Sequence, residues 1–177
     1  MLRVKAGDLD KMSLLFERYH RKLFGFLFHM TYQREVSEDM VQQVFYKMLK
    51  YSHTFTGQGE FVHWMYSIAR NVLKDQFKKN KGFQYQDANA MEYELADSTS
   101  LEDQLESKQA KAELLRAMGR LSEEQREILT LSRFQELKYT EIAGIMNITP
   151  GAAKVRVHRA IQDLKDIYLK MERKTGI

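Results

Sequence analysis

Residues 139–164 read YTEIAGIMNITPGAAKVRVHRAIQDL, and this stretch decides the fold of the C-terminal part of the chain. A short apolar segment, a three-residue turn and a second helix with basic residues follow one another in it. Thr149 can accept a hydrogen bond from a free backbone N–H of the second helix, and Pro150 suits the first helical position. Apolar residues then recur at steps of three and four, which predicts one buried side: Ala153, Val157, Ala160, Ile161 and Leu164.

Another side of this second helix is basic and remains available to a partner. It carries Lys154, Val155, Arg156, His158 and Arg159. A helix-turn-helix whose second helix is charged is a common way for a small helical domain to enter the DNA major groove. We therefore predict a DNA-binding C-terminal domain. For Arg156 a second interpretation stays open, namely an ion pair within the domain.

Composition narrows the class of protein. The chain has 177 residues, 44% of them hydrophobic, with one proline, nine glycines and no cysteine. Few runs alternate apolar with polar residues, so we predict an all-α fold. Without cysteine, and with five histidines that lack ligand spacing, we expect no metal site. No glycine-rich phosphate loop appears either, so we expect no cofactor and no catalysis by this chain.

Targeting signals are missing as well. No window approaches the eighteen or so apolar residues of a membrane span, and the N-terminal residues lack a signal-peptide apolar stretch. We therefore expect a cytoplasmic protein without direct membrane insertion.

Charge divides the chain into three parts. Residues 1–80 carry a net charge of +5 (13 Lys and Arg against 8 Asp and Glu), residues 81–119 carry −4, and residues 120–177 carry +3. The polar middle lacks a sustained helical period. We predict two small helical domains, 1–80 and 106–177, joined by a flexible acidic linker over 81–105. A merely solubilising tether is the plainer interpretation of that linker.

The N-terminal domain begins with two predicted helices. Asp8 is expected to cap the first, and Ser37 the second. The second has a predicted buried stripe of Val41, Val44, Phe45, Met48 and Leu49. Its opposite face carries Asp39, Gln42, Gln43, Tyr46 and Lys47, which could simply be solvated.

A glycine-containing loop over 52–60 leads to a helix predicted for 61–79. One face of that helix presents Trp64, Ser67, Asn71, Lys74 and Lys78. An aromatic ring, an amide and two ammonium groups suit unpaired nucleic acid, because rings stack on bases and cations hold phosphates. Packing and solubility are the alternative explanation of this face.

Three motifs in this order make the chain similar to the extracytoplasmic-function (ECF) sigma factors of the sigma-70 family. The first is SEDMVQQVF at 37–45, and the second is FTGQGEFVHWMYSIARN at 55–71. The third is LSEEQREIL at 121–129, followed by the helix-turn-helix. The resemblance covers residues 5–170. The chain departs from the family at Val62 and His63, where an arginine and a threonine are common.

The resemblance implies a role for each face. The 39–47 face would dock on the coiled-coil clamp of core RNA polymerase. Phe55, Trp64, Ser67, Asn71, Lys74 and Lys78 would bind the −10 promoter element, whose flipped base would enter a pocket at the loop. The basic face of the 150–164 helix would bind the −35 element. The implied partners are core polymerase (β′ clamp and β flap), promoter DNA and an anti-sigma factor.

Family relatives also give the linker a sharper role. In them it threads the RNA-exit path of the polymerase, where acidic side chains would imitate RNA. Here these would be Asp87, Glu92, Glu94, Asp97, Glu102 and Asp103.

Two other classes of protein stay open. A one-component helix-turn-helix regulator would bind duplex DNA as a dimer without polymerase. A sigma-like decoy would bind polymerase without starting transcription. Transcription assays with purified core polymerase separate all three.

Overall fold

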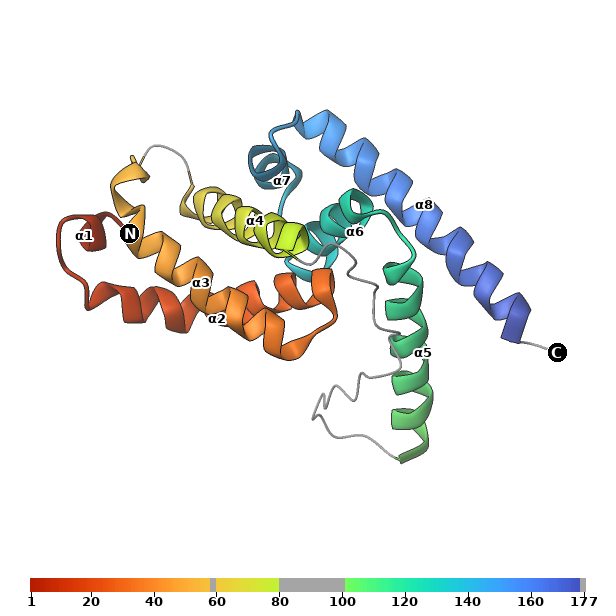
Figure 1. Cartoon of the computed structure of the whole chain (residues 1–177). Coiled ribbons are helices and arrows are strands. Elements are labelled where there is room, and N and C mark those ends of the chain that lie inside the picture. The colour runs from red at the N-terminus through yellow and green to blue at the C-terminus, as the bar shows by residue number, and fades with distance from the viewer. Residues whose placement is uncertain (58–59, 80–100, 176–177) are drawn as a thin grey trace.

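The computed structural model describes residues 1–57, 60–79 and 101–175, with side chains of the last range from 110 to 173. These residues form helices and connecting turns, and no strand occurs among them, which confirms the all-α prediction. In Figure 1, α1–α4 gather on one side of the molecule and α5–α8 on the other, with α7 beside α4. The predicted acidic linker falls mostly outside the described residues. Helix α5 begins at Leu101, within the range that was predicted for the linker.

The N-terminal half is built on three long helices, α2 (Lys11–Thr31), α3 (Arg34–Lys50) and α4 (Phe61–Lys79). A four-residue helix, α1 (Leu2–Lys5), precedes them, and a short 3-10 turn, Ser52–Thr54, follows α3. Their apolar stripes meet in a shared core. It is lined by Leu23, Phe26, Leu27, Met40, Val44, Met48, Met65, Ala69 and Val72.

The C-terminal half contains α5 (Leu101–Gly119), α6 (Glu123–Leu129), α7 (Tyr139–Met146) and α8 (Pro150–Thr175). A π-helical turn, Thr130–Phe134, extends α6. The amide of Ala152 donates to Oγ1 of Thr149 at 3.1 Å, and Pro150 is the first residue of α8, so both predictions for this helix start are confirmed. The helix-turn-helix is therefore α7, the turn after it and α8.

Two predicted helix caps are wrong. Helix α2 begins at Lys11, after Asp10, so Asp8 lies outside it. Helix α3 begins at Arg34, and Ser37 is buried inside its first turn. The Ser37 hydroxyl donates to the Gln33 carbonyl at 2.6 Å and lies 2.8 Å from the Thr31 hydroxyl. Buried hydroxyls need partners, and here that requirement overrides the capping preference of serine.

The predicted buried stripe of α3 is mostly confirmed, but Leu49 is wrong. Val41, Val44, Phe45 and Met48 are buried, whereas the Leu49 side chain is 39% exposed. Met40 is buried instead. The apolar stripe therefore lies nearer the start of α3 than predicted, and Leu49 joins its outer face.

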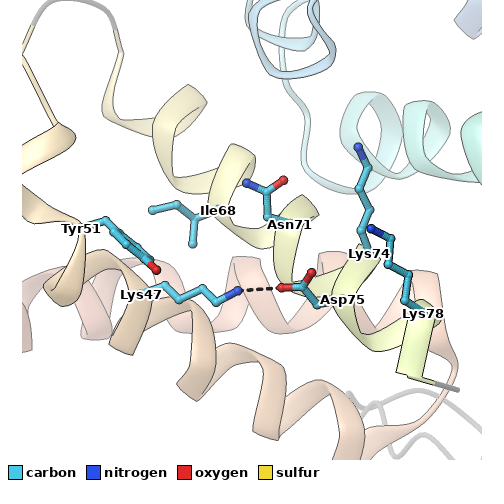
Figure 2. Close-up of a pocket in the computed structure, with 7 residues that line it drawn as sticks. All are labelled: Lys47, Tyr51, Ile68, Asn71, Lys74, Asp75 and Lys78. Atoms are coloured by element: carbon cyan, nitrogen blue, oxygen red, sulfur yellow. Dashed lines mark hydrogen bonds and ion pairs between the residues drawn. The ribbon is translucent and has the colours of Figure 1, made fainter.

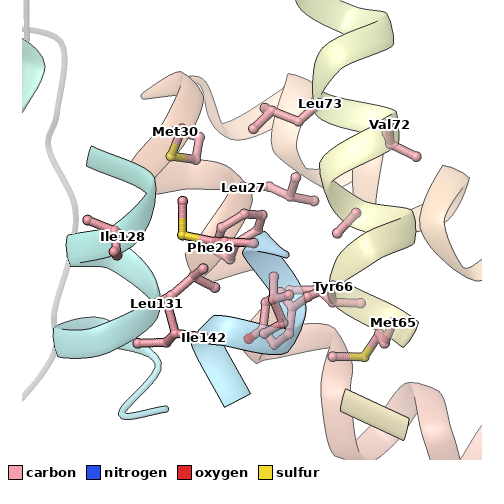
Figure 3. Close-up of a cluster of buried hydrophobic side chains, with 14 of the residues drawn as sticks. Phe26, Leu27, Met30, Met65, Tyr66, Val72, Leu73, Ile128, Leu131 and Ile142 are labelled. Carbon is pink, nitrogen blue, oxygen red and sulfur yellow. The ribbon is translucent and has the colours of Figure 1, made fainter. Parts of the chain in front are cut away.

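The two halves share one hydrophobic core. Phe26 and Tyr66 of the N-terminal half belong to the same buried cluster as Ile128, Leu131 and Ile142 of the C-terminal half, as Figure 3 shows. The ring of Tyr66 meets that of Phe26 edge-on, with centroids 5.3 Å apart. Tyr66 is 1% exposed because the second half covers it. In the described part of the chain, no helix is long and apolar enough to cross a membrane.

His29 lies at the junction of the halves, on α2. Its ring centroid is 3.9 Å from that of Phe134, in the π-helical turn. Burial disfavours the charged imidazolium and lowers the pKa of His29 from 6.5 to about 4. The unfolded chain therefore takes up a proton near pH 6.5 that the folded chain does not accept until about pH 4.

We predict that stability falls as the pH is lowered from about 7 to about 4, because protonation then favours the unfolded chain. The His29 contribution to this loss is about 3 kcal/mol at most. Urea unfolding of the wild type and of His29→Gln, at pH 7 and at pH 4.5, measures it. The variant should lose less stability than the wild type over this interval, and an equal loss in both contradicts the assignment.

Candidate nucleic-acid interfaces

A pocket of about 400 Å³ lies between α3 and α4. This volume falls in the range of small-ligand sites, roughly 300–1,000 Å³. Figure 2 shows its walls, which combine an aromatic ring, an amide and three ammonium groups with one carboxylate. The lining residues are Lys47, Tyr51, Ile68, Asn71, Lys74, Asp75 and Lys78.

One ion pair crosses the mouth of this pocket. Nζ of Lys47 on α3 donates to Oδ2 of Asp75 on α4 at 2.9 Å. The hydrogen bond and charge of Lys47, with smaller effects of Lys78 and Lys79, hold the pKa of Asp75 below its usual value. The carboxylate therefore stays ionised and neutralises one of the three cations while the pocket is empty.

The structure regroups the residues predicted from the sequence. Lys47, predicted to dock on polymerase, lines the pocket together with Asn71, Lys74 and Lys78 of the predicted −10 face. Tyr51 was missed because it follows the end of α3 and belongs to no periodic stripe. Its ring is partly exposed, so a flat ligand can reach it.

The other predicted −10 residues lie away from the pocket lining. Phe55 is only 8% exposed, and its ring packs against those of Trp64 and Phe61, with centroids 5.3 and 6.0 Å away. Nε1 of Trp64 donates to Oγ1 of Thr54 at 3.1 Å. Ser67 donates to a carbonyl one turn earlier in α4. Phe55 thus supports the loop rather than offering its ring face to a base.

The outer face of α3 is exposed, as predicted for Asp39, Gln42 and Gln43. Tyr46 is 65% exposed and lies on the same helix as the exposed Leu49. This face joins carboxylate, amide and apolar groups, a mixture that suits a protein partner.

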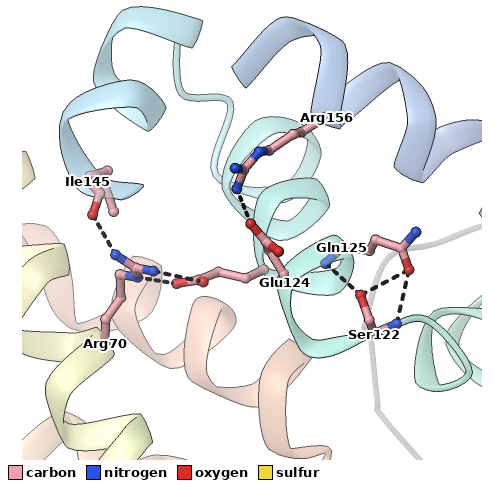
Figure 4. A network of polar contacts seen from close by, with 7 residues as sticks. Arg70, Ser122, Glu124, Gln125, Ile145 and Arg156 are labelled. Atoms are coloured by element: carbon pink, nitrogen blue, oxygen red, sulfur yellow. Dashed lines mark hydrogen bonds and ion pairs between the residues drawn. The ribbon is translucent and has the colours of Figure 1, made fainter. Parts of the chain in front are cut away.

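The basic face of α8 is exposed at Lys154, Val155, Arg156, His158 and Arg159. Nη1 of Arg156 donates to Oε1 of Glu124 on α6, as Figure 4 shows. The ion pair within the domain, which the sequence left open for Arg156, is therefore present. The remaining cations project from a helix that is anchored by its buried residues Ala153, Val157 and Ala160.

Polar contacts tie α4 to the helix-turn-helix half. Nε of Arg70 donates to Oε1 of Glu127 at 2.5 Å, and its Nη1 donates to the carbonyl of Ile145 at 2.7 Å (Figure 4). The hydroxyl of Tyr66 donates to Oε1 of Gln135 at 2.9 Å. Sequence reasoning did not single out these residues, because their partners lie 57 to 75 positions away.

A close approach of α4 and α7 completes this junction. A Cβ added at Gly144 would lie 2.7 Å from Nδ1 of His63, so no larger residue fits without displacing the histidine ring. His63 is one of the positions at which the chain departs from the ECF pattern. Among the described residues, no group of three or more His, Cys, Asp or Glu could hold a metal ion.

Comparison with known families agrees with this geometry. The family model of sigma-70 region 2 matches residues 15–83, and that of sigma-70 region 4 matches residues 111–164, together more than half of the chain. The first range contains the pocket, and the second contains α7, the turn after it and α8 as far as residue 164.

Individual relatives agree as well. The ECF RNA polymerase sigma factor BldN of Streptomyces coelicolor is 31% identical over 92% of this chain and 62% of its own length. The RNA polymerase sigma factor CarQ of Myxococcus xanthus is 27% identical, with 97% of each chain covered. The sigma factor RpoE of Bartonella quintana, solved with the anti-sigma factor NepR, superposes with a TM-score of 0.70 at 21% identity, covering 89% of this chain and 96% of RpoE.

The chain therefore belongs to the sigma-70 family, as an ECF sigma factor. Members of this family direct promoter-specific initiation of transcription and are DNA-binding regulators. This function is favoured over that of a one-component regulator, the alternative that the sequence had left open.

We predict that Glu127→Ala weakens the junction between the halves, because it leaves the half-buried Arg70 without its carboxylate. Hydrogen bonds to charged groups contribute about 1.5–3 kcal/mol, so we expect a loss of that size in the free energy of unfolding. Urea unfolding measures it. The matched control is Glu123→Ala, an exposed position on the same helix, which should stay within about 0.5 kcal/mol of the wild type. Equal values for the two variants would mean that the Arg70 contact contributes nothing.

Proposed function

We propose that this chain binds core RNA polymerase through α3, reads the −35 duplex with α8 and captures a flipped −10 base in the pocket between α3 and α4. The pocket is the observation that carries the proposal. It places a partly exposed ring, an amide and cations around one opening, beside a family motif that the sequence had already assigned to the −10 element.

Each wall of the pocket has a chemical task. The ring of Tyr51 offers a stacking surface, and Asn71 offers both a donor and an acceptor to a base edge. Lys74 and Lys78 line the same pocket, and their ammonium groups would bind the flanking phosphates. Unstacking one base costs a few kcal/mol, which stacking and edge hydrogen bonds can recover on the single strand. Strand separation is then driven by binding, and the chain itself carries out no catalysis.

The −35 contact is made by the exposed basic face of α8. Lys154, His158 and Arg159 reach duplex DNA directly, whereas Arg156 must first leave Glu124. Each good bidentate contact to a base edge discriminates by about 1–3 kcal/mol. When a DNA phosphate replaces the Glu124 carboxylate, Arg156 still has a negatively charged partner.

Initiation requires the two halves to separate. The −10 and −35 elements lie about 25 base pairs apart, or roughly 85 Å at about 3.4 Å per pair. A compact chain of 177 residues has a radius of gyration of roughly 16 Å, so it cannot cover both elements at once. The packed arrangement is therefore the state before polymerase binding, and docking on polymerase opens the junction at Arg70.

Further parts of the proposal rest on the family. The chain acts in the cytoplasm, where polymerase and promoters are. It contacts the β′ clamp through α3 and the β flap through its C-terminal half. An anti-sigma factor is a further partner, which is supported by the fold shared with RpoE, a protein solved with NepR.

The direct test supplies the pure chain to core polymerase that lacks its own sigma subunit, with fragmented genomic DNA of the source organism as template. Sequencing of transcript 5′ ends should reveal start sites that share two upstream elements at constant spacing. Binding to polymerase without such transcripts would mean a decoy. DNA binding in the absence of polymerase, without promoter-dependent transcripts, would mean a regulator.

We predict that Asn71→Ala reduces open-complex formation on such a promoter about fivefold or more, because one base-edge contact of about 1 kcal/mol is lost. Permanganate reactivity of unpaired thymines measures the opening. Affinity for core polymerase should not change, because Asn71 belongs to α4 and not to the outer face of α3. Gln76→Ala, which removes an amide of the same helix outside the pocket, serves as control. Equal opening by both variants would remove Asn71 from the site.

A further inference from the structure

Helix α1 contacts the loop that connects the proposed polymerase face to α4. Nζ of Lys5 donates to the backbone carbonyl of Phe55 at 2.9 Å, across 50 positions of sequence. Val4 of the same helix is 3% exposed, so α1 is packed against the body of the domain. The match to sigma-70 region 2 begins at residue 15, so α1 precedes the matched range.

A second contact lies two residues further along the loop. Gly57 has a φ of +76°, a conformation that side chains with a Cβ rarely adopt. A Cβ at this position would meet Cδ2 of Leu2 at 3.0 Å. The Leu2 side chain therefore lies directly against the Gly57 backbone, and α1 contacts the loop at two points.

The opposite side of the loop is held by α4. The Phe55 ring packs on Trp64, and Oγ1 of Thr54 accepts the hydrogen bond of the Trp64 indole. The loop backbone is thus fixed between Lys5 on one side and Trp64 on the other. A change at Lys5 can therefore reach Trp64 through Phe55, which contacts both residues.

We propose that α1 is a positioning element for the −10 loop, in which Lys5 and Leu2 hold the backbone of Phe55 and Gly57 in the conformation that recognises the promoter. This inference rests on the proposed −10 pocket, because Tyr51 of that pocket directly precedes the loop and Asn71 follows Trp64 on α4. Holding a binding loop in its bound conformation lowers the entropy lost on binding, so the effect is on affinity and discrimination at the −10 element. Core and −35 binding lie elsewhere and are unaffected.

The chain provides its own reporter, because Trp64 is its single tryptophan. Lys5→Met removes the donor, Lys5→Arg keeps a donor and the charge, and Arg3→Met removes a charge from an exposed position of the same helix. We expect a red-shifted Trp64 emission and stronger quenching by acrylamide in Lys5→Met, but not in Lys5→Arg or Arg3→Met. Circular dichroism should show unchanged helix content, and Leu2→Ala should give the same Trp64 change by the second contact.

The functional measurement uses holoenzyme formed with core polymerase on a promoter found in the transcription assay. We expect Lys5→Met to discriminate about three- to tenfold less well between the native −10 element and its single-base variants. A loss of this size corresponds to one hydrogen bond. Lys5→Arg should restore discrimination, and Arg3→Met should retain it. Transcription from promoters with altered −35 elements should be equal for the wild type, Lys5→Met, Lys5→Arg and Arg3→Met.

The outcomes separate this inference from the proposed function. Absence of promoter-dependent transcripts with the wild type refutes the proposed function, and with it the promoter role of α1. Normal transcripts with unchanged Trp64 quenching in Lys5→Met refute the positioning role alone. Normal −10 discrimination by Lys5→Met, or an equal loss in Arg3→Met, refutes it too.

Discussion

One arginine side chain connects the two halves of the molecule. Arg70 projects from α4 and binds the Glu127 carboxylate and the Ile145 carbonyl of the helix-turn-helix half. The planar guanidinium presents several N–H donors in a fixed fork, so Arg70 donates to both acceptors at once. Since a half-buried charge must keep partners, α4 and α7 stay together until another partner or water replaces these contacts. The shared core around Tyr66 and Ile142 reinforces this constraint.

Paired charges also occur at each proposed DNA-binding face. Lys47 is paired with Asp75 in the pocket, and Arg156 with Glu124 beside the −35 helix. Both pairs join neighbouring helices and are partly exposed, so each contributes little to stability. A phosphate can replace either carboxylate at small cost. In the proposed function, these acids hold the cations in place before DNA arrives, and the shared core keeps the halves together until polymerase binds.

The helix-turn-helix was predictable because its signals are local. Thr149 and Pro150 start α8 where the sequence indicated, and α4 spans the predicted residues. Ser37 and Leu49 were predicted wrongly, because a buried hydroxyl network and the register of a packed helix depend on neighbours that are distant in sequence. The junction was not predictable at all. No periodic pattern in the sequence indicates that the C-terminal half covers Tyr66 and Arg70. Among the pocket residues, helical spacing predicted Asn71 and the lysines as exposed candidates, but it did not predict Tyr51.

We infer that the free chain is closed at Arg70 and that core polymerase opens it. The chain has no cysteine, so Arg21→Cys on α2 and Asp166→Cys on α8, both exposed, can be spin-labelled without side reactions. Electron–electron double resonance should give one narrow distance distribution for the free chain. Saturating core polymerase should shift it to longer distances. An unchanged distribution in a holoenzyme that initiates transcription would mean that polymerase does not open the junction.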